Sequence, residues 1–334
     1  MKQPIRVRRR SVLQGAAISL AMTGLPRLNL ETRTAAAASI PPEGAAFLNP
    51  DATAEDLTNA WFAMLSLTGA ETGVLGTSAE VDARSQELIR PLLHSAFLLQ
   101  RASGERYVAS TYVPSDIDLF RITDVVETRP SENLIVARYA VQTTGASTAD
   151  SSLVMSDELA PRLSVFHWDD DIAQWKLLSH ANFNTPIAAI CDQDALVPPM
   201  NPSIPTSAED MSLVEQLIEM SGQYVLAGDV RPLFDPQIQA QSASGRGYAT
   251  IANMMPSKYT KFEPSDVLAT RSNDLLVTAY NALQAGELHG ETVRSGRNPR
   301  IVTWRLTEDG TWKQIAFAGF ATPPELPAGQ DCVS

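Results

Sequence analysis

The chain has 334 residues, of which 44% are hydrophobic and 19% are charged, and its formal net charge at pH 7 is −12. This length is sufficient for two domains of ordinary size. The acidic balance repels phosphate backbones and anionic lipid, so it excludes nucleic acid as a partner. Beyond the N-terminal segment, no stretch is apolar and long enough to span a membrane.

The first 38 residues predict a cleaved signal peptide. Three arginines at 8–10 precede an apolar run over 12–25, and alanines stand at 36–38. Residues 9–14 resemble the twin-arginine export signal. We therefore expect export, to the periplasm or outside the cell, with cleavage near Ala38. Cleavage there removes seven basic residues and one acidic residue, which changes the net charge from −12 to −18.

The rest of the chain contains an internal repeat. Residues 89–107 align without a gap with residues 230–248, and both share an Arg-Pro-Leu segment and a later Ser-Gly. Such internal similarity indicates a tandem duplication. We predict an exposed N-terminal segment at 39–52 and a first domain at 53–186. A proline-rich linker at 187–206, a second domain at 207–323 and a C-terminal tail at 324–334 follow.

Each half is predicted to open with an amphipathic helix. Thr53 and Ser207 are each followed three residues later by an aspartate, a pattern typical of a helix N-cap. Apolar residues then recur at helical spacing. A short helix or turn follows at 90–92 and again at 231–233, where proline suits the first turn.

Strands are predicted after these helices. The runs rich in β-branched and aromatic residues are 135–141, 163–168 and 175–183 in the first half, and 276–282, 301–306 and 312–320 in the second. Acidic residues at 169–171 and 308–310 separate the last two strands of each half and predict hairpin turns. Helices followed by strands, twice over, define an α+β class.

Both halves end in the pattern Trp-Lys-x-x-x-x-Ala-x-Phe-x-Thr-Pro, at 175–186 and 312–323. With the order of elements, this pattern resembles the NTF2-like superfamily, and its SnoaL-like branch in particular. The resemblance implies two tandem cone-shaped domains, each of N-terminal helices packed on a strongly curved antiparallel sheet. It also implies that the two domains pack as an internal pseudo-dimer. Members of the superfamily include isomerases, cyclases, dehydratases and protein-binding modules, so the fold alone selects no function.

Candidate site residues emerge from differences between the halves. His180 aligns with Phe317, and Asn182 aligns with Gly319. Strand alternation places Lys176, Leu178, His180 and Asn182 on one face, and His180 could act there as an acid or base. Further candidates for ligand binding are Asn182, Tyr139, Arg138 and Tyr107. The alternative is that His180 and Asn182 make ordinary structural hydrogen bonds.

Metal and cofactor chemistry find no support in the sequence. His94, His167, His180 and His289 show no metal-ligand spacing, and no phosphate-binding or dinucleotide motif is present, so we predict neither a metal nor a cofactor. Cys191 and Cys332 could form a disulfide after export or remain two thiols.

Three functions compete. The first is an exported protein whose domains bind a small, largely apolar ligand or a protein partner, without defined catalysis. The second is a SnoaL-like isomerase, cyclase or dehydratase that uses His180 as acid or base, helped by Asn182 or Tyr139. It predicts that His180 meets a tyrosine and a carboxylate such as Asp116, Asp118 or Asp124 in one cavity. The third is a structural component of a larger periplasmic assembly, which would show filled cones.

Overall fold

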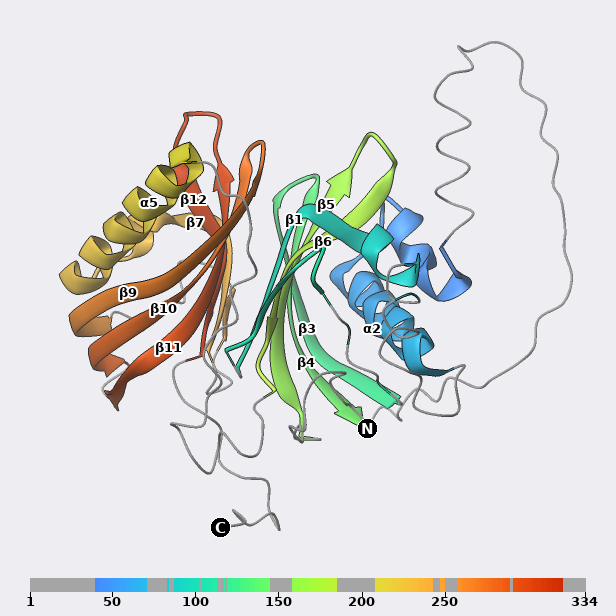
Figure 1. Cartoon of the computed structure of the whole chain (residues 1–334), viewed down its shortest axis with the longest axis horizontal. Helices are drawn as coiled ribbons and strands as arrows, with labels where there is room; N and C mark the ends of the chain where they lie inside the picture. The colour runs from blue at the N-terminus through green and yellow to red at the C-terminus, as the bar shows by residue number, and fades with distance from the viewer. Residues whose placement is uncertain are drawn as a thin grey trace, which may run out of the picture.

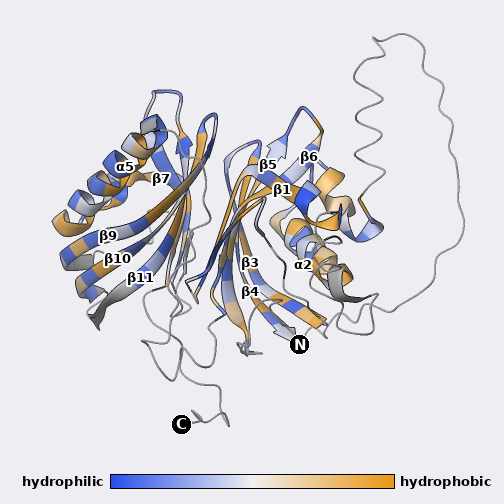
Figure 2. Cartoon of the chain, viewed as in Figure 1, coloured by the Kyte–Doolittle hydropathy of each residue, from blue (hydrophilic) through white to orange (hydrophobic). Residues whose placement is uncertain are grey.

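The computed structural model contains two curved sheets that lie back to back, with one long helix on the outer side of each (Figure 1). Figure 2 shows that apolar residues run along the strands of both sheets and along both helices, interspersed with polar ones. The residues that the structure describes are 40–70, 83, 87–102, 104–112, 114, 117, 119–144, 158–184, 208–242, 247–249, 257–288 and 291–320.

The first helix, α2 (Ala54–Ala70), begins as predicted. The Thr53 hydroxyl accepts the backbone N–H of Asp56 at 3.2 Å, and the Asp56 carboxylate accepts the Thr53 N–H at 3.0 Å. This reciprocal pair satisfies backbone donors that the first turn of a helix leaves free. The second helix, α5 (Ala208–Ala227), confirms the other predicted helix, whereas its cap residue Ser207 lies outside the described residues.

The first sheet has six strands in the order β2-β1-β6-β5-β4-β3. Their bounds are Leu93–Arg101 for β1, Arg106–Val108 for β2, Leu119–Ser131 for β3, Leu134–Thr144 for β4, Ala160–Asp169 for β5 and Gln174–Asn182 for β6. All neighbours are antiparallel except β1 and β6, which are parallel. The first long strand of the sheet, β1, thus pairs in parallel with its last strand, β6. The sheet is therefore mixed, whereas a fully antiparallel sheet was predicted.

The second sheet repeats this order as β8-β7-β12-β11-β10-β9, again with one parallel pair, β12 and β7. Its strands are β7 (Phe234–Ser242), β8 (Gly247–Ala249), β9 (Ser257–Ser272), β10 (Leu275–Leu288), β11 (Glu291–Leu306) and β12 (Trp312–Gly319). Short 3-10 helices, η2 (Arg90–Leu92) and η4 (Arg231–Leu233), precede β1 and β7. The predicted strands and the two acidic hairpin turns are thus confirmed.

Bulges at matching places bend both sheets. Asp124 in β3 and Asp266 in β9 have left-handed backbone angles, with φ of 56° and 52°. The pairing register shifts beside each of them. Because a bulged strand bends and twists more strongly than a regular one, these positions curve each sheet around its helix.

The concave side of the first sheet encloses a core that also includes the N-terminal segment. Residues 40–52 were expected to be exposed, but Pro42–Leu48 forms the 3-10 helix η1, and Phe47 within it is fully buried against Phe166. The Trp175 indole N–H donates to the carbonyl of Asn49 at 2.9 Å. The segment predicted to be exposed, 39–52, is thus exposed at positions such as Glu43 and Asp51 and buried at Phe47, because its apolar side chains pack against the sheet.

The convex faces of the two sheets share one apolar cluster. It contains Leu178, Ala181 and Phe183 from the first half and Ile315, Ala318 and Phe320 from the second. The rings of Phe183 and Phe320, which occupy equivalent positions in the sequence, stack with centroids 4.3 Å apart. A residue that meets its own counterpart marks a local two-fold axis, as in an isologous interface.

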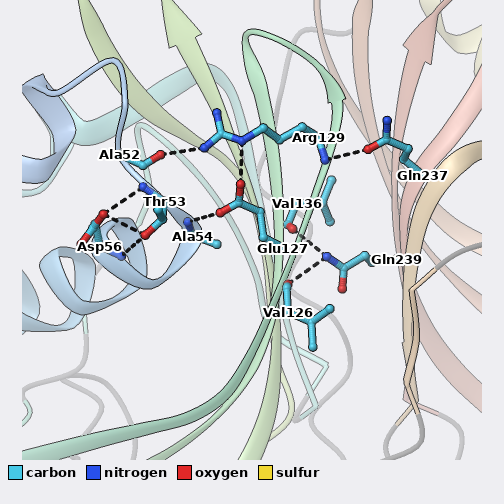
Figure 3. A network of polar contacts seen from close by, with 10 residues as sticks. All are labelled: Ala52, Thr53, Ala54, Asp56, Val126, Glu127, Arg129, Val136, Gln237 and Gln239. Carbon is cyan, nitrogen blue, oxygen red and sulfur yellow. Dashed lines mark hydrogen bonds and ion pairs between the residues drawn. The ribbon is translucent and has the colours of Figure 1, made fainter.

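Polar contacts join the same faces. Buried Arg106 of β2 donates to the carbonyl of Asp266 and, at 3.2 Å, to the Asn281 side chain. Figure 3 shows a second network. The Glu127 carboxylate of β3 accepts the Ala54 N–H at the start of α2 at 2.6 Å, and Gln239 of β7 donates to two backbone carbonyls of the first sheet. One strand therefore connects the first helix to the second sheet.

Within the described residues, no helix has the length and apolar character needed to cross a membrane. The predicted signal peptide, the linker over 187–206, the tail over 324–334, Cys191, Cys332 and His289 lie outside those residues.

Candidate functional site

A cavity of about 30 Å³ lies inside the first cone, between α2 and the concave face of the sheet. A cavity needs about 10–15 Å³ of this kind of volume to hold one water molecule. This cavity therefore has room for two or three. Its apolar lining is Trp61, Phe62, Leu65, Leu99 and Ile117, and its polar lining is Arg101, Tyr112, Thr143, Arg162, His180, Asn182 and Asn184. The lining is more polar than the apolar cup expected from the sequence.

His180 lies in this lining and is 3% exposed. Its Nδ1 is 2.9 Å from the Ser164 hydroxyl, which in turn is 3.0 Å from the Tyr139 hydroxyl. Burial lowers the pKa of His180 well below its ordinary value, and the positive charges of Arg162 and Arg101 lower it further. The imidazole is therefore neutral at physiological pH, held by a chain of hydroxyl groups.

Two buried arginines dominate the electrostatics of the cavity. Arg101 is 3% exposed and forms an ion pair with Glu105 at 3.1 Å. Arg162 is 2% exposed, and its Nη1 donates to the carbonyl of Pro161 at 2.7 Å. Burial lowers the pKa of Arg162 to about 10, still well above physiological pH, so the guanidinium stays charged.

Four lining residues carry a buried polar atom that has no hydrogen-bond partner among the residues described. These atoms are Trp61 Nε1, Thr143 Oγ1, Arg162 Nε and Asn184 Oδ1. An unsatisfied buried polar group costs about 1–3 kcal/mol, and proteins normally pair such groups. Four of them border this one cavity, which has room for two or three water molecules.

The face assignment along β6 was correct for His180 and Asn182, which both line the cavity, but wrong for Lys176 and Leu178. Leu178 belongs to the core between the sheets, whereas Leu177 and Trp175 face the cone. A bulge breaks the alternation, because Val165 pairs with Ser179 while Phe166 pairs with Leu177. Two successive residues, Leu178 and Ser179, thus face the second sheet, and Ser179 bonds Thr303 there at 2.7 Å.

The remaining sequence candidates lie around the cavity rather than in it. Tyr139 reaches His180 through Ser164, and burial raises its pKa to about 12. Tyr107 packs under the guanidinium of Arg101, whose Cζ is 4.9 Å from the ring centroid. Arg138 lies on the convex side against Gly247 of β8, where any Cβ would collide with it. Burial lowers the pKa of Arg138, and the charge of Asp124 opposes this shift.

The carboxylates proposed as partners of His180 do not meet it in the described residues. Asp124 is exposed on β3, and Asp116 and Asp118 lie outside the described residues. The sequence reading missed Arg101, Arg162, Thr143, Trp61 and Asn184. One signal was available for Arg162: it aligns with Arg300, so a charge recurs at the same place in two otherwise apolar strands.

Away from the cavity, the His94 and His167 rings meet edge to face with centroids 5.1 Å apart. Their counterparts in the second half, Asp235 and Arg305, form an ion pair at 2.7 Å. Within the described part of the chain, no group of three or more histidine, cysteine or acidic residues could hold a metal ion.

Solved structures similar to this chain carry NTF2-like folds. An NTF2-like protein from Cytophaga hutchinsonii is 20% identical, with a TM-score of 0.29, and the match covers 35% of this chain and 99% of that one. An NTF2-like protein from Rhodospirillum rubrum is 17% identical, with a TM-score of 0.28, and the match covers 34% of this chain and 98% of that one.

A provisionally assigned ketosteroid isomerase from Shewanella frigidimarina is 15% identical, with a TM-score of 0.27, and the match covers 31% of this chain and 91% of that one. No protein-family profile matches the chain, and no curated protein does. These likenesses to solved structures concern the fold alone and select no function.

Proposed function

We propose that this chain is an exported small-molecule-binding protein whose first cone holds the ligand. The observation that carries the proposal is the cavity, bordered by four buried polar atoms that have no hydrogen-bond partner among the described residues. A few placed polar groups among apolar and aromatic walls are typical of ligand sites. The mixed lining favours a ligand with a polar end and a short apolar end over the largely apolar ligand expected from the sequence.

Binding is favoured over acid–base catalysis by the state of His180. A general base is most effective when its pKa lies near the working pH, whereas burial and two arginines hold the pKa of His180 far below it. In addition, no carboxylate of the described residues lines the cavity with it.

The second candidate is a SnoaL-like isomerase, cyclase or dehydratase that uses His180. The contact with Ser164, fixed in turn by Tyr139, supports it, because that contact orients the imidazole within the cavity. If this candidate holds, His180→Phe, which installs the residue of the second half, abolishes turnover of a bound ligand. Persistence of turnover in the variant excludes it.

We also propose that the two domains form the internal counterpart of a homodimer. The shared apolar cluster and the stacked pair Phe183 and Phe320 support this arrangement. The twin-arginine motif at residues 9–14 supports export. Changing both Arg9 and Arg10 to Lys should leave the precursor inside a host that has the twin-arginine pathway, and fractionation measures this. Unchanged export overturns that part of the proposal.

Ligand-observed NMR with the purified mature chain tests the binding function. The probes are soluble fragments of up to about six heavy atoms, both neutral and charged, a size set by the cavity. We expect Leu99→Phe, which enlarges a lining residue, to remove the binding seen with the unaltered protein. The matched control is Leu226→Phe at a position 48% exposed on α5, which should change nothing. Binding of no fragment, or equal binding by both variants, contradicts the proposal.

A further inference from the structure

Arg162 carries a buried positive charge that no carboxylate of the described residues balances. It is 2% exposed, and its Nη1 donates to backbone carbonyls while its Nε has no partner there. Burial lowers the pKa of Arg162, and the side chains whose charges act on it are Tyr139, Arg101 and Tyr112, none of which is a carboxylate. Carbonyl oxygens offer hydrogen bonds but no counter-charge.

A charge in such a position destabilises the protein unless something compensates it. The effective penalty of burying one ion is several kcal/mol even after relaxation. Arg101 shows the usual solution, because it pairs with Glu105 at 3.1 Å. For Arg162, no such carboxylate partner is found among the described residues.

The second cone shows another solution for the same arginine. Arg300 is the counterpart of Arg162, since each pairs across the sheet with a tyrosine, Tyr280 or Tyr139. Arg300 donates to the Gln284 side chain and to the carbonyl of Pro299, and it lies over the Phe317 ring with Cζ 5.8 Å from the centroid. The second cone therefore gives its arginine a side-chain acceptor and an aromatic face, but no carboxylate among the described residues.

The first cone has a shorter residue where the second has Gln284. Thr143 and Gln284 each pair with a phenylalanine of the neighbouring strand, Phe120 and Phe262, which establishes their equivalence. The Thr143 hydroxyl is buried and has no partner among the described residues. The exchange of glutamine for threonine thus removes the internal acceptor and leaves polar atoms around the cavity.

We propose that the first cone binds a small monocarboxylate, with Arg162 as its charge partner. The proposal rests on the small-molecule function proposed above. A planar guanidinium is the side chain best matched to a carboxylate. Trp61 Nε1 and the Thr143 hydroxyl are further donors in the lining that have no partner among the described residues. Leu65, Leu99 and Ile117 supply walls for a short alkyl chain. The volume of about 30 Å³ limits the ligand to a few heavy atoms.

Isothermal titration calorimetry of the mature chain with sodium propionate tests this inference. Propionamide is the neutral probe of the same shape, and sodium chloride and sodium phosphate at matched ionic strength are the inorganic anions. We expect propionate to bind at least about tenfold more tightly than propionamide, because hydrogen bonds to charged groups contribute roughly 1.5–3 kcal/mol. Chloride or phosphate that binds as well as propionate overturns the choice of a carboxylate.

Thr143→Gln is the decisive variant, because it installs the acceptor that Arg300 has. We expect it to fold with unchanged or higher thermal stability and to lose at least about tenfold in propionate affinity. Arg162→Gln should lose the same affinity, and Thr260→Gln, at an exposed position of β9, should lose none. A folded Thr143→Gln protein with full propionate affinity overturns the proposal.

The outcomes separate this inference from the function on which it rests. If propionamide or another neutral fragment binds in the first cone and propionate does not, the carboxylate assignment is wrong while the binding function stands. If neither binds and the NMR panel detects no fragment, both are wrong.

Discussion

The two cones of this molecule have the same strand order and the same buried arginine, but they treat that arginine differently. In the second cone, Gln284 and the ring of Phe317 surround Arg300. In the first, Thr143 and His180 stand at those positions, and a cavity lies beside Arg162. The same arginine is therefore held by side chains in one copy and borders a cavity in the other, and two neighbouring residues account for the difference.

A second pair of positions differs in the same way. In the first half, the rings of His94 and His167 contact each other. At the equivalent positions of the second half, Asp235 and Arg305 form an ion pair. The fold therefore tolerates either two neutral rings or two opposite charges at this site. The requirement common to both is that the pair carries no net charge at neutral pH.

The largest expected effect concerns the apolar cluster between the two sheets. Phe183→Ala and Phe320→Ala should each lower the free energy of unfolding by about 3–5 kcal/mol, because each leaves a cavity between the sheets. The double variant should cost less than the sum, by about 1 kcal/mol, since each single change already removes the stacked pair. Denaturant titration measures these values. Fully additive costs would show that the rings do not stabilise one another.

The next effect concerns the histidine pair. Burial lowers the pKa of His94 from 6.5 to about 4, with His167 and Lys176 lowering it further and Asp169 and Asp274 opposing them. Between those pH values the unfolded chain binds more protons, so stability is complete above pH 6.5 and falls as the pH approaches 4. The loss should reach up to about 3 kcal/mol.

The control for this pH dependence is the double variant His94→Asp with His167→Arg, which installs the ion pair of the second half. Its unfolding free energy should decline less between pH 6.5 and 4 than that of the unaltered protein. The decline that remains comes partly from His180, whose pKa is also lowered. Identical pH profiles for the two proteins would assign the acid sensitivity elsewhere.

The smallest effect separates the two cones directly. Gln284→Ala removes the acceptor of a buried guanidinium and should cost about 2 kcal/mol, the penalty for an unpaired buried group. Thr143→Ala removes a hydroxyl that has no partner among the described residues, so its cost should be close to zero. Denaturant titration measures the free energy of unfolding of both variants. Equal losses would show that Gln284 contributes no more to the second cone than Thr143 does to the first.

Much of the fold could be predicted from the sequence because its signals are local. The Thr53 cap, the helical spacing after it and the dense strands such as Ile135–Val141 each reflect a local rule. The strand β1 was not predicted, since Leu93–Arg101 is nearly all buried and shows no alternation. Its parallel pairing with β6 joins segments about 80 residues apart, which no local pattern encodes.

The site was predictable only in part. His180 and Asn182 were found because the other half lacks them, whereas Arg162 was missed because the other half has it. A comparison of the two halves finds positions where the residue differs. It does not find a residue such as Arg162, which is the same in both halves but has different neighbours. The bulge at Leu178 was also missed, because β6 is buried on both faces and its sequence therefore shows no clear alternation that the bulge could interrupt.

The parallel pairing of β1 with β6, and of β7 with β12, has a consequence for synthesis. Each sheet places its last strand between its earlier ones, so neither can close until that strand has left the ribosome. The apolar back of the first sheet, including Phe183, stays uncovered until residue 319 has been made. We therefore expect the nascent chain to be most prone to aggregation while its second half is still being translated.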